Sequence, residues 1–350
     1  MAIRSRAPLR IGFAGGGTDL ESFSRLNGGA VFSATISMYA YCTIVPTDTG
    51  RIQIYSSDNK NDLEINSVPN IALDGDRLIL HRGVYNRIVK EFNRGEPLSF
   101  TMSTSNDAPV GSGLGTSSTM IVAILEAFRK WLGFDISSYE MAQLAYDIER
   151  KDLGLAGGKQ DQYSAVFGGF NLFEFNRDGT VTDNHLVLPG NIVNELESSM
   201  LLYYSGRSRK SAEQQMHLAG NIIHSQIKGT RESNDATIQA LLELKEYAYD
   251  MRGCMMNGDF PGVIKCLNKE WEAKKKTSGI ISNEALEKTI DFAMNNGAEA
   301  VKVSGAGGGG FLLLYCDPIH RQKLTDALKS LDGAVYAVRF ARHGVESWTI

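Results

Sequence analysis

The sequence of 350 residues lacks the features that mark several classes of protein. It has only four cysteines, at Cys42, Cys254, Cys266 and Cys316. Because none of them forms a CxxC pair, we expect free thiols that pack in the interior rather than a disulfide framework or a zinc site. No apolar run approaches the roughly 20 residues of a membrane span, and no basic leader precedes a long apolar core. These absences predict a cytoplasmic protein that does not associate with a membrane.

Positive charge is not in excess either. Lys and Arg together number 36 and Asp and Glu number 40, so the formal net charge is -4 at pH 7. A general nucleic-acid binder needs a concentrated basic surface to neutralise phosphates. We therefore expect no nucleic-acid partner, and any phosphate that the protein binds should lie in a local pocket.

Apolar periodicity predicts an α+β fold with two domains. In the first part, strand-like runs occupy residues 9–13, 40–45, 52–55 and 98–102. Helical spacing of apolar residues occupies 78–92, 118–131 and 137–150. A hairpin is expected over 168–188, and Pro189 and Gly190 then break the pattern. In the second part, helical spacing occupies 236–256, 261–276 and 283–296, and strand-like runs occupy 300–303, 311–315 and 334–340. We expect domains over 1–189 and 190–350, with a cleft at their interface.

The segment from Pro109 to Thr119, PVGSGLGTSST, is the most informative part of the chain. Its glycines leave backbone N–H groups uncovered where an apolar helical run begins, which is how proteins hold a polyphosphate. The hydroxyls that follow can cap that helix or reach a bound magnesium ion. We therefore expect ATP as a ligand, held by Pro109, Gly111, Ser112, Gly113, Leu114, Gly115, Thr116, Ser117, Ser118 and Thr119.

Two commoner phosphate motifs do not match. A Walker A loop needs GxxxxGK followed by Ser or Thr, and the nearest candidate, Gly154 to Gln160, is one residue short and ends in Gln. A GxGxxG fingerprint would need a third glycine where Thr116 stands, and no convincing strand-helix-strand unit surrounds it. A turn that merely starts a helix would explain Gly113 or Gly115 alone, but not alternating glycines followed by four hydroxyls.

Two further glycine-rich segments flank this loop. Near the N-terminus, residues 6–20, RAPLRIGFAGGGTDL, run from a strand into a triple-glycine turn that could hold sugar hydroxyls. Near the C-terminus, residues 304–311, SGAGGGGF, link two apolar strands by a loop almost without side chains. A hairpin needs only one or two glycines, so we expect the backbone to come close to a ligand there. The candidate substrate contacts in these loops are Gly16, Gly17, Thr18, Asp19, Gly307 and Gly308.

In their order along the chain, the three segments resemble the motifs of the GHMP kinases, the family of galactokinase, homoserine kinase, mevalonate kinase and phosphomevalonate kinase. Pro109 to Ser118 resembles the PxGxGLGSSS motif of the family, with Thr116 in place of the usual Ser. The first motif departs most, because Gly16 and Gly17 replace an acidic residue and a histidine of the galactokinase pattern. The resemblance implies the two-domain GHMP kinase fold, with the active-site cleft between the domains.

The resemblance also implies roles for single residues. Phosphoryl transfer needs a positioned acceptor, a metal and neutralisation of charge. By resemblance, Ser118 and Glu149 bind magnesium, and Asp161 faces the acceptor hydroxyl as a general base or as an electrostatic orienter. Arg10 would pair with Asp161 and balance the growing negative charge. Taken singly, both acids could instead be solvated surface groups.

The GGGTDL version of the first motif resembles the bacterial heptose 7-phosphate kinases most and the kinase part of the L-fucokinases next. The resemblance implies a sugar-1-kinase that uses ATP and magnesium to phosphorylate a small sugar phosphate, heptose 7-phosphate, for nucleotide-activated heptose and surface glycans. The phosphate of that substrate would need cations, and the basic turn with Arg207, Arg209 and Lys210 offers them, although such turns are as often merely solvated. An L-fucokinase and a catalytically dead sensor of sugar and ATP remain alternatives, and a homodimer is left open.

Overall fold

A computed structural model describes residues 1–58, 61–206, 216, 218–222, 235–305 and 307–350. Within these ranges the strands form one sheet of eight and one sheet of four. The larger sheet contains β1 (Ile3–Ala14), β2 (Gly29–Pro46), β3 (Arg51–Ser56), β4 (Asn61–Asn66), β5 (Phe100–Asn106), β6 (Phe170–Phe175), β7 (Val181–Leu186) and β12 (Glu346–Thr349). Its strand order is β12-β1-β2-β5-β3-β4, and β6 and β7 extend it from β2.

The long strands β1 and β2 join the two regions of this sheet. Residues 29–34 of β2 pair with β6, whereas residues 40–46 pair with β5. The register of β1 against β2 shifts after Pro8 and again after Gly12. A proline has no N–H to donate to the ladder, and such irregularities bend and twist a strand pair. The shifts therefore fall just before and just after Arg10.

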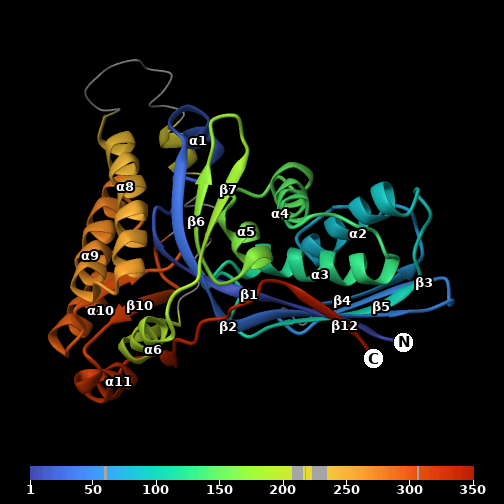
Figure 1. Ribbon diagram of the computed structural model, residues 1–350. Coiled ribbons are helices and arrows are strands. Elements are labelled where there is room, and N and C mark those ends of the chain that lie inside the picture. The colour runs from blue at the N-terminus through green and yellow to red at the C-terminus, as the bar shows by residue number, and fades with distance from the viewer. Residues whose placement is uncertain (59–60, 207–215, 217, 223–234, 306) are drawn as a thin grey trace.

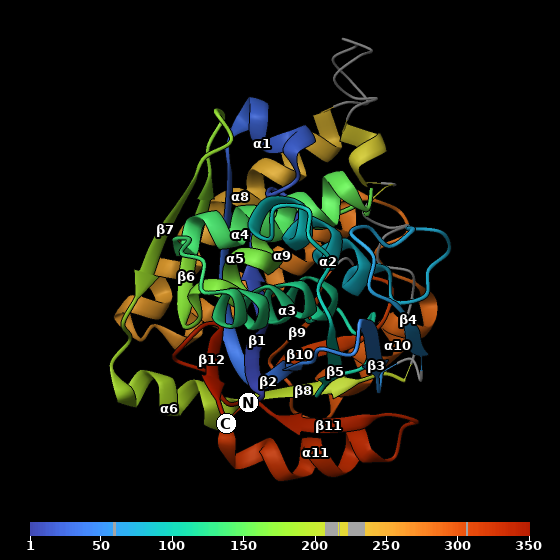
Figure 2. The ribbon, with the colours of Figure 1, turned by 90° about the vertical axis from the view of Figure 1, so that its right-hand side faces the viewer.

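Helices cover one face of the larger sheet. They are α2 (Ile79–Phe92), α3 (Thr116–Leu132), α4 (Ser138–Asp147), the short π-helix η1 (Ile148–Asp152) and α5 (Gln160–Phe167), whereas α1 (Glu21–Asn27) lies near β6 and β7 (Figure 1 and Figure 2). Tyr85 of α2 and Phe128 of α3 are fully buried against Phe100 of β5. Burial of these large apolar side chains is the main stabilising contribution to this layer.

The smaller sheet has the antiparallel order β11-β8-β10-β9. Its strands are β8 (Met200–Tyr204), β9 (Ala300–Val303), β10 (Phe311–Tyr315) and β11 (Ala334–Ala337), and its helices are α6 (Gly190–Ser199), α8 (Asp235–Asn257), α9 (Phe260–Thr277), α10 (Glu284–Asn295), the 3-10 turn η2 (Pro318–His320) and α11 (Arg321–Lys329). One apolar cluster includes Phe13 and Phe32 of the larger sheet, Met251 of α8 and Phe311 of β10. The two sheets are therefore joined by a continuous core.

The predicted α+β fold is confirmed, and each predicted strand or helix overlaps an observed one. However, β1 and β2 are much longer than the runs expected over 9–13 and 40–45, and β5 begins at Phe100 rather than at residue 98. The elements α1, β4, α6, α11 and β12 have no predicted counterpart, and two predicted elements end differently. The helix expected over 137–150 ends as an α-helix at Asp147 and continues as the π-helix η1. The strand expected over 334–340 ends at Ala337, and Phe340 makes only an isolated bridge to Ile36. The four cysteines are free, as expected.

The last strand returns to the first half of the molecule. β12 pairs with β1 from Ile3 opposite Thr349 to Arg6 opposite Glu346, which places the two ends of the chain side by side (Figure 1). The predicted boundary between residues 189 and 190 lies at the start of α6 and stays a prediction, but residues 346–349 belong to the larger sheet. Among the helices that the structure describes, none is long and apolar enough to cross a membrane.

Candidate active site

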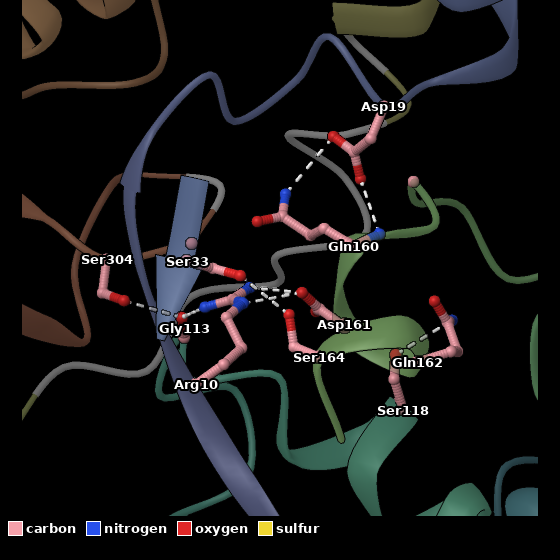
Figure 3. Close-up of polar contacts among 12 residues, drawn as sticks. Arg10, Asp19, Ser33, Gly113, Ser118, Gln160, Asp161, Gln162, Ser164 and Ser304 are labelled. Atoms are coloured by element: carbon pink, nitrogen blue, oxygen red, sulfur yellow. Dashed lines mark hydrogen bonds and ion pairs between the residues drawn. The ribbon is translucent and has the colours of Figure 1, made fainter. Parts of the chain in front are cut away.

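The central and C-terminal glycine loops touch each other through their backbones. The carbonyl of Gly113 accepts a hydrogen bond from Ser304 Oγ at 3.0 Å (Figure 3). Phe311 N donates to the carbonyl of Ser112 at 2.9 Å. Gly113 has a φ of 85°, and a Cβ there would lie 2.5 Å from the carbonyl oxygen of Ser304. Only glycine allows both that backbone conformation and that approach. The glycines therefore let two distant segments meet.

Arg10 connects this contact to Asp161. Its Nη1 donates to the carbonyl of Gly113 at 2.6 Å, while Nε and Nη2 lie 2.7 Å and 2.6 Å from Asp161 Oδ1 (Figure 3). The Arg10 side chain is 5% exposed and that of Asp161 is 15% exposed. Asp161 stands in the first turn of α5, where the helix dipole favours a carboxylate. The structure thus brings together the two residues that the sequence predicts as a catalytic pair.

Two cavities meet at this pair. The first, which we call the loop cavity, is lined by Gly111, Gly113 and Gly115, by Thr116, Ser117 and Ser118 of α3, and by Glu149 and Arg150. The second, which we call the inner cavity, is lined by Gly16, Gly17, Asp19, Gln160 and Lys274, among others. Arg10, Asp161 and Gly305 line both. Asp161 therefore forms part of the wall of both cavities.

The loop cavity has the features of a phosphate site. Gly115 precedes the first residue of α3 with a φ of 80°, and among the described residues no side-chain hydrogen bond caps that helix end. Free N–H groups at a helix N-terminus attract anions. Of the other predicted residues, Ser112 and Thr119 are buried, and their hydroxyls have no partner within the described part of the chain. Leu114 is fully buried, and its carbonyl accepts from Arg10 N at 3.1 Å.

Ser118 and Glu149 lie together at the floor of the loop cavity. Ser118 Oγ donates to Glu149 Oε2 at 2.6 Å, and Gln162 Nε2 donates to the same oxygen at 2.6 Å. Arg150 Nη1 lies 3.2 Å from Glu149 Oε1. No cluster of three or more His, Cys, Asp or Glu suited to a metal occurs among the described residues. A hydroxyl and one carboxylate fit Mg²⁺, which in such sites takes its remaining oxygens from phosphates and water.

Asp19 is the buried acid of the inner cavity. Its Oδ2 accepts from Gln160 N at 3.1 Å, and its Oδ1 accepts from Gly17 N at 3.1 Å and from Gln160 Nε2 at 3.3 Å (Figure 3). Burial raises the pKa of this carboxyl, the bond from Gln160 N opposes the rise, and the charge of Asp161 adds to it. A Cβ on Gly158 would lie 1.8 Å from Asp19 Oδ2, so this glycine lets the carboxylate take its place.

The other predicted substrate contacts of the first glycine segment do not all line the inner cavity. Gly16 and Gly17 line the inner cavity. Thr18 is fully buried, and its hydroxyl bonds the carbonyls of Gly15 and Ala30 at 2.8 and 2.9 Å, so it fixes the turn.

Gly307 and Gly308 pack on Ile281, whose carbonyl accepts from Gly308 N at 2.7 Å. Gly308 lines a separate cavity beside α10, whereas Gly305, among the described residues of this loop, lines the inner cavity. Arg207, Arg209 and Lys210 lie outside the described residues.

Sequence reasoning missed two lysines of the inner cavity. Lys302 of β9 forms an ion pair with Glu270 at 2.8 Å and donates to the carbonyl of Phe13 at 2.9 Å. Lys274 of α9 donates to the carbonyl of Gly305 at 2.6 Å, and burial lowers its pKa to about 8. Both side chains are buried. The inner cavity therefore contains more positive charge than its glycine motif indicates.

Comparisons with known proteins agree with this geometry. Residues 79–169 match the family model of the GHMP kinases N terminal domain, and residues 237–332 match that of the GHMP kinases C terminal domain. The chain is 39% identical over 348 residues to D-glycero-alpha-D-manno-heptose 7-phosphate kinase of Campylobacter jejuni, and the match covers 99% of both chains.

Comparison with solved structures also finds kinases of similar fold. The chain is similar to a D-glycero-D-manno-heptose 1-phosphate kinase from Bacteroides thetaiotaomicron, with a TM-score of 0.83, 41% identity and coverage of 99% of both chains. A mevalonate kinase with 19% identity and a TM-score of 0.73 shares the fold. The two family models cover the central and the C-terminal glycine loops, and the full-length relative covers all three loops, so the protein belongs to the GHMP kinase family.

Proposed function

We propose that the protein transfers the γ-phosphoryl group of ATP to the anomeric hydroxyl of D-glycero-D-manno-heptose 7-phosphate. The product would be heptose 1,7-bisphosphate, a precursor of nucleotide-activated heptose for surface glycans. The observation that carries the proposal is the meeting of two cavities at the Arg10–Asp161 pair. The names of the two heptose kinases reported above support a sugar that already carries a phosphate.

In this proposal ATP occupies the loop cavity. Its phosphates would lie against the N-terminus of α3 and the N–H groups of the glycine loop. Ser118 and Glu149 would hold magnesium, which neutralises phosphate charge when bound. Glu149 Oε2 accepts hydrogen bonds from Ser118 and Gln162, and it would give up at least one of them to bind the metal.

The acceptor would occupy the inner cavity, with its anomeric hydroxyl against Asp161. Arg10 holds Asp161 Oδ1 with two nitrogens, which leaves Oδ2 to accept the hydrogen bond of the hydroxyl. Asp161 would orient that hydroxyl and accept its proton as the new bond to phosphorus forms. Arg10 also binds the carbonyl of Gly113, so one side chain fixes the distance between the two substrates.

The test is ADP release from ATP and magnesium across heptose 7-phosphate, heptose 1-phosphate, L-fucose, mannose, galactose and mevalonate. Turnover confined to heptose 7-phosphate, and lost in Asp161→Asn, is the expected result. Turnover of free L-fucose would instead assign the protein to the fucokinases, of which the Arabidopsis thaliana bifunctional enzyme is 26% identical over 327 residues. Binding of ATP and sugar without any turnover would identify a sensor.

Two finer points belong to the same proposal. We expect the reaction to take place in the cytoplasm, where ATP is supplied, and fractionation of cells that carry a tagged chain tests this. The oligomeric state is proposed to be a homodimer, and light scattering coupled to size-exclusion chromatography distinguishes it from a monomer.

A further inference from the structure

The inner cavity contains a buried ammonium without a close counter-ion. Lys274 is 7% exposed, and its Nζ donates one hydrogen bond, to the carbonyl of Gly305 at 2.6 Å. The described residues form eighteen ion pairs, and none of them includes Lys274. No described carboxylate therefore lies within 4.0 Å of this nitrogen. An ammonium has three donors. Two N–H groups of Lys274 therefore have no described acceptor.

The neighbouring lysine shows what a compensated site looks like. Lys302 is 3% exposed, and Glu270, which is fully buried, lies 2.8 Å from its Nζ. Glu270 stands one turn before Lys274 on α9, yet its carboxylate forms its ion pair with Lys302. A buried charge is costly unless it is paired. Of the two buried lysines, Lys302 therefore has a paired carboxylate, and Lys274 has none among the described residues.

The charged groups around Lys274 do not remove this imbalance. Burial is the largest influence and lowers its pKa to about 8; Glu270 on the same helix raises it, Lys302 of β9 and Arg10 of β1 lower it, and Asp19 raises it least. A buried cation in a cavity with such a lowered pKa is a candidate for binding a charged ligand. A bound anion would supply the missing counter-charge.

The position of Lys274 indicates which substrate would bring that anion. Its Nζ lies 3.6 Å from the place that a Cβ on Gly16 would take, so it faces the triple-glycine turn. Lys274 lines the inner cavity but does not line the loop cavity, where the nucleotide phosphates are proposed to bind. The anion should therefore belong to the acceptor and not to ATP.

We propose that Lys274 binds the phosphate group that the acceptor sugar already carries and thereby selects phosphorylated sugars over neutral ones. This inference rests on the proposed sugar-kinase function and names the residue that would set its substrate class. It also differs from the expectation that the basic turn at 207–210 holds this phosphate, and the two assignments predict different effects of mutation.

The experiment compares heptose 7-phosphate with the same heptose lacking the phosphate, in the wild-type protein, in Lys274→Met and in Lys276→Met. Lys276 stands on the same helix with its side chain 62% exposed, so its replacement is the matched control. We expect Lys274→Met to lower kcat/KM for heptose 7-phosphate about 10- to 100-fold, the worth of a charged hydrogen bond. In Lys274→Met the KM for ATP and the activity on the neutral heptose should change little, and the Lys276→Met enzyme should behave like the wild-type protein. Lys274→Arg should restore part of the preference for the phosphorylated sugar.

Two results would overturn the inference. An unchanged preference for the phosphorylated sugar in Lys274→Met would move the phosphate site elsewhere, for example to the basic turn. An equal loss on both sugars, with a lowered unfolding temperature, would show that Lys274 only supports the fold through Gly305.

If the wild-type protein phosphorylates neither sugar, the proposed function fails, and a binding measurement still decides the present inference. Titration calorimetry with inorganic phosphate, in the presence of magnesium and a non-hydrolysable ATP analogue, would then compare the wild-type protein with Lys274→Met. Binding that is lost in the variant supports the anion site. Equal binding, or no binding to either protein, refutes it.

Discussion

The Arg10–Asp161 pair should couple strongly in the free energy of unfolding, and a double-mutant cycle measures this. The variants are Arg10→Met, Asp161→Leu and the protein that carries both. Each replacement roughly keeps the shape of the side chain but removes its charge. In each single variant the remaining charge stays buried, because both side chains are at most 15% exposed.

The expected magnitudes follow from that burial. Breaking a buried ion pair by removing one partner costs about 3–5 kcal/mol, whereas removing both partners leaves no uncompensated charge and costs much less. Arg10 also loses its bond to the carbonyl of Gly113, which adds about 1 kcal/mol to its single variant. We expect each single change to cost about 3–5 kcal/mol, and the double change to cost no more than the weaker single change.

Urea unfolding followed by tryptophan fluorescence gives the four free energies at pH 7. The coupling energy should be at least about 2 kcal/mol, within the range found for residues in direct contact. Costs that add to within about 0.5 kcal/mol would refute the reasoning, since they would mean that the two charges are separately solvated rather than paired.

Three further predictions concern the two cavities. Gly158→Ala should raise the KM for the acceptor about tenfold or more and leave the KM for ATP unchanged, because its Cβ would displace the carboxylate of Asp19; steady-state kinetics test this, with Gly190→Ala, whose Cβ meets open space and whose backbone lies outside the left-handed region, as the control. Glu149→Gln should raise the magnesium concentration needed for half-maximal rate at least about tenfold, since an amide oxygen carries no charge; an unchanged magnesium titration would remove Glu149 from the metal site. The KM for a phosphorylated acceptor should rise as the pH rises through about 8, because the lowered pKa of Lys274 means that its positive charge is lost there; Lys274→Arg should flatten this profile from pH 7 to 9, and a wild-type profile already flat over that range would contradict the assignment.

Glycine spacing made most of the loop cavity predictable. A glycine between polar residues in a run such as PVGSGLGTSST has few structural roles besides positive φ and close backbone approach, and Gly113 shows both. The approach of Ser304 to Gly113 could not be predicted, because hydrogen bonds between segments 191 residues apart depend on the packing of the two sheets. The sequence thus indicated the loops but not their contact.

Lys274 was missed for a physical reason. It stands in the run Lys274-Lys275-Lys276 near the end of a helix, a pattern that normally indicates a solvated basic face. Trp271, three residues earlier, is 3% exposed, so residues 271 and 274 share the buried face. The spacing of three residues from Trp271 indicates that Lys274 is buried, but the charge of the three lysines favours a solvated face instead.

Glu149 illustrates the opposite case, in which the residue was predicted and its geometry was not. Apolar spacing indicated an α-helix to residue 150, but the backbone widens into the π-helix η1 at Ile148. Single π-turns within helices are frequent at functional sites and leave no reliable trace in a sequence. This turn brings Glu149 Oε2 within 2.6 Å of Ser118 Oγ on another helix.

Arg10 couples the position of the first glycine segment to that of the central loop. Its backbone N donates to the carbonyl of Leu114, and its side chain holds both Gly113 and Asp161. The strand that carries it also leads directly into Gly16 and Gly17, which line the inner cavity. A shift of β1 would therefore move the central glycine loop, Asp161 and the triple-glycine turn at once. Lys274 and Asp19 line the inner cavity and not the loop cavity, so we expect their replacement to change the choice of acceptor without changing the binding of ATP.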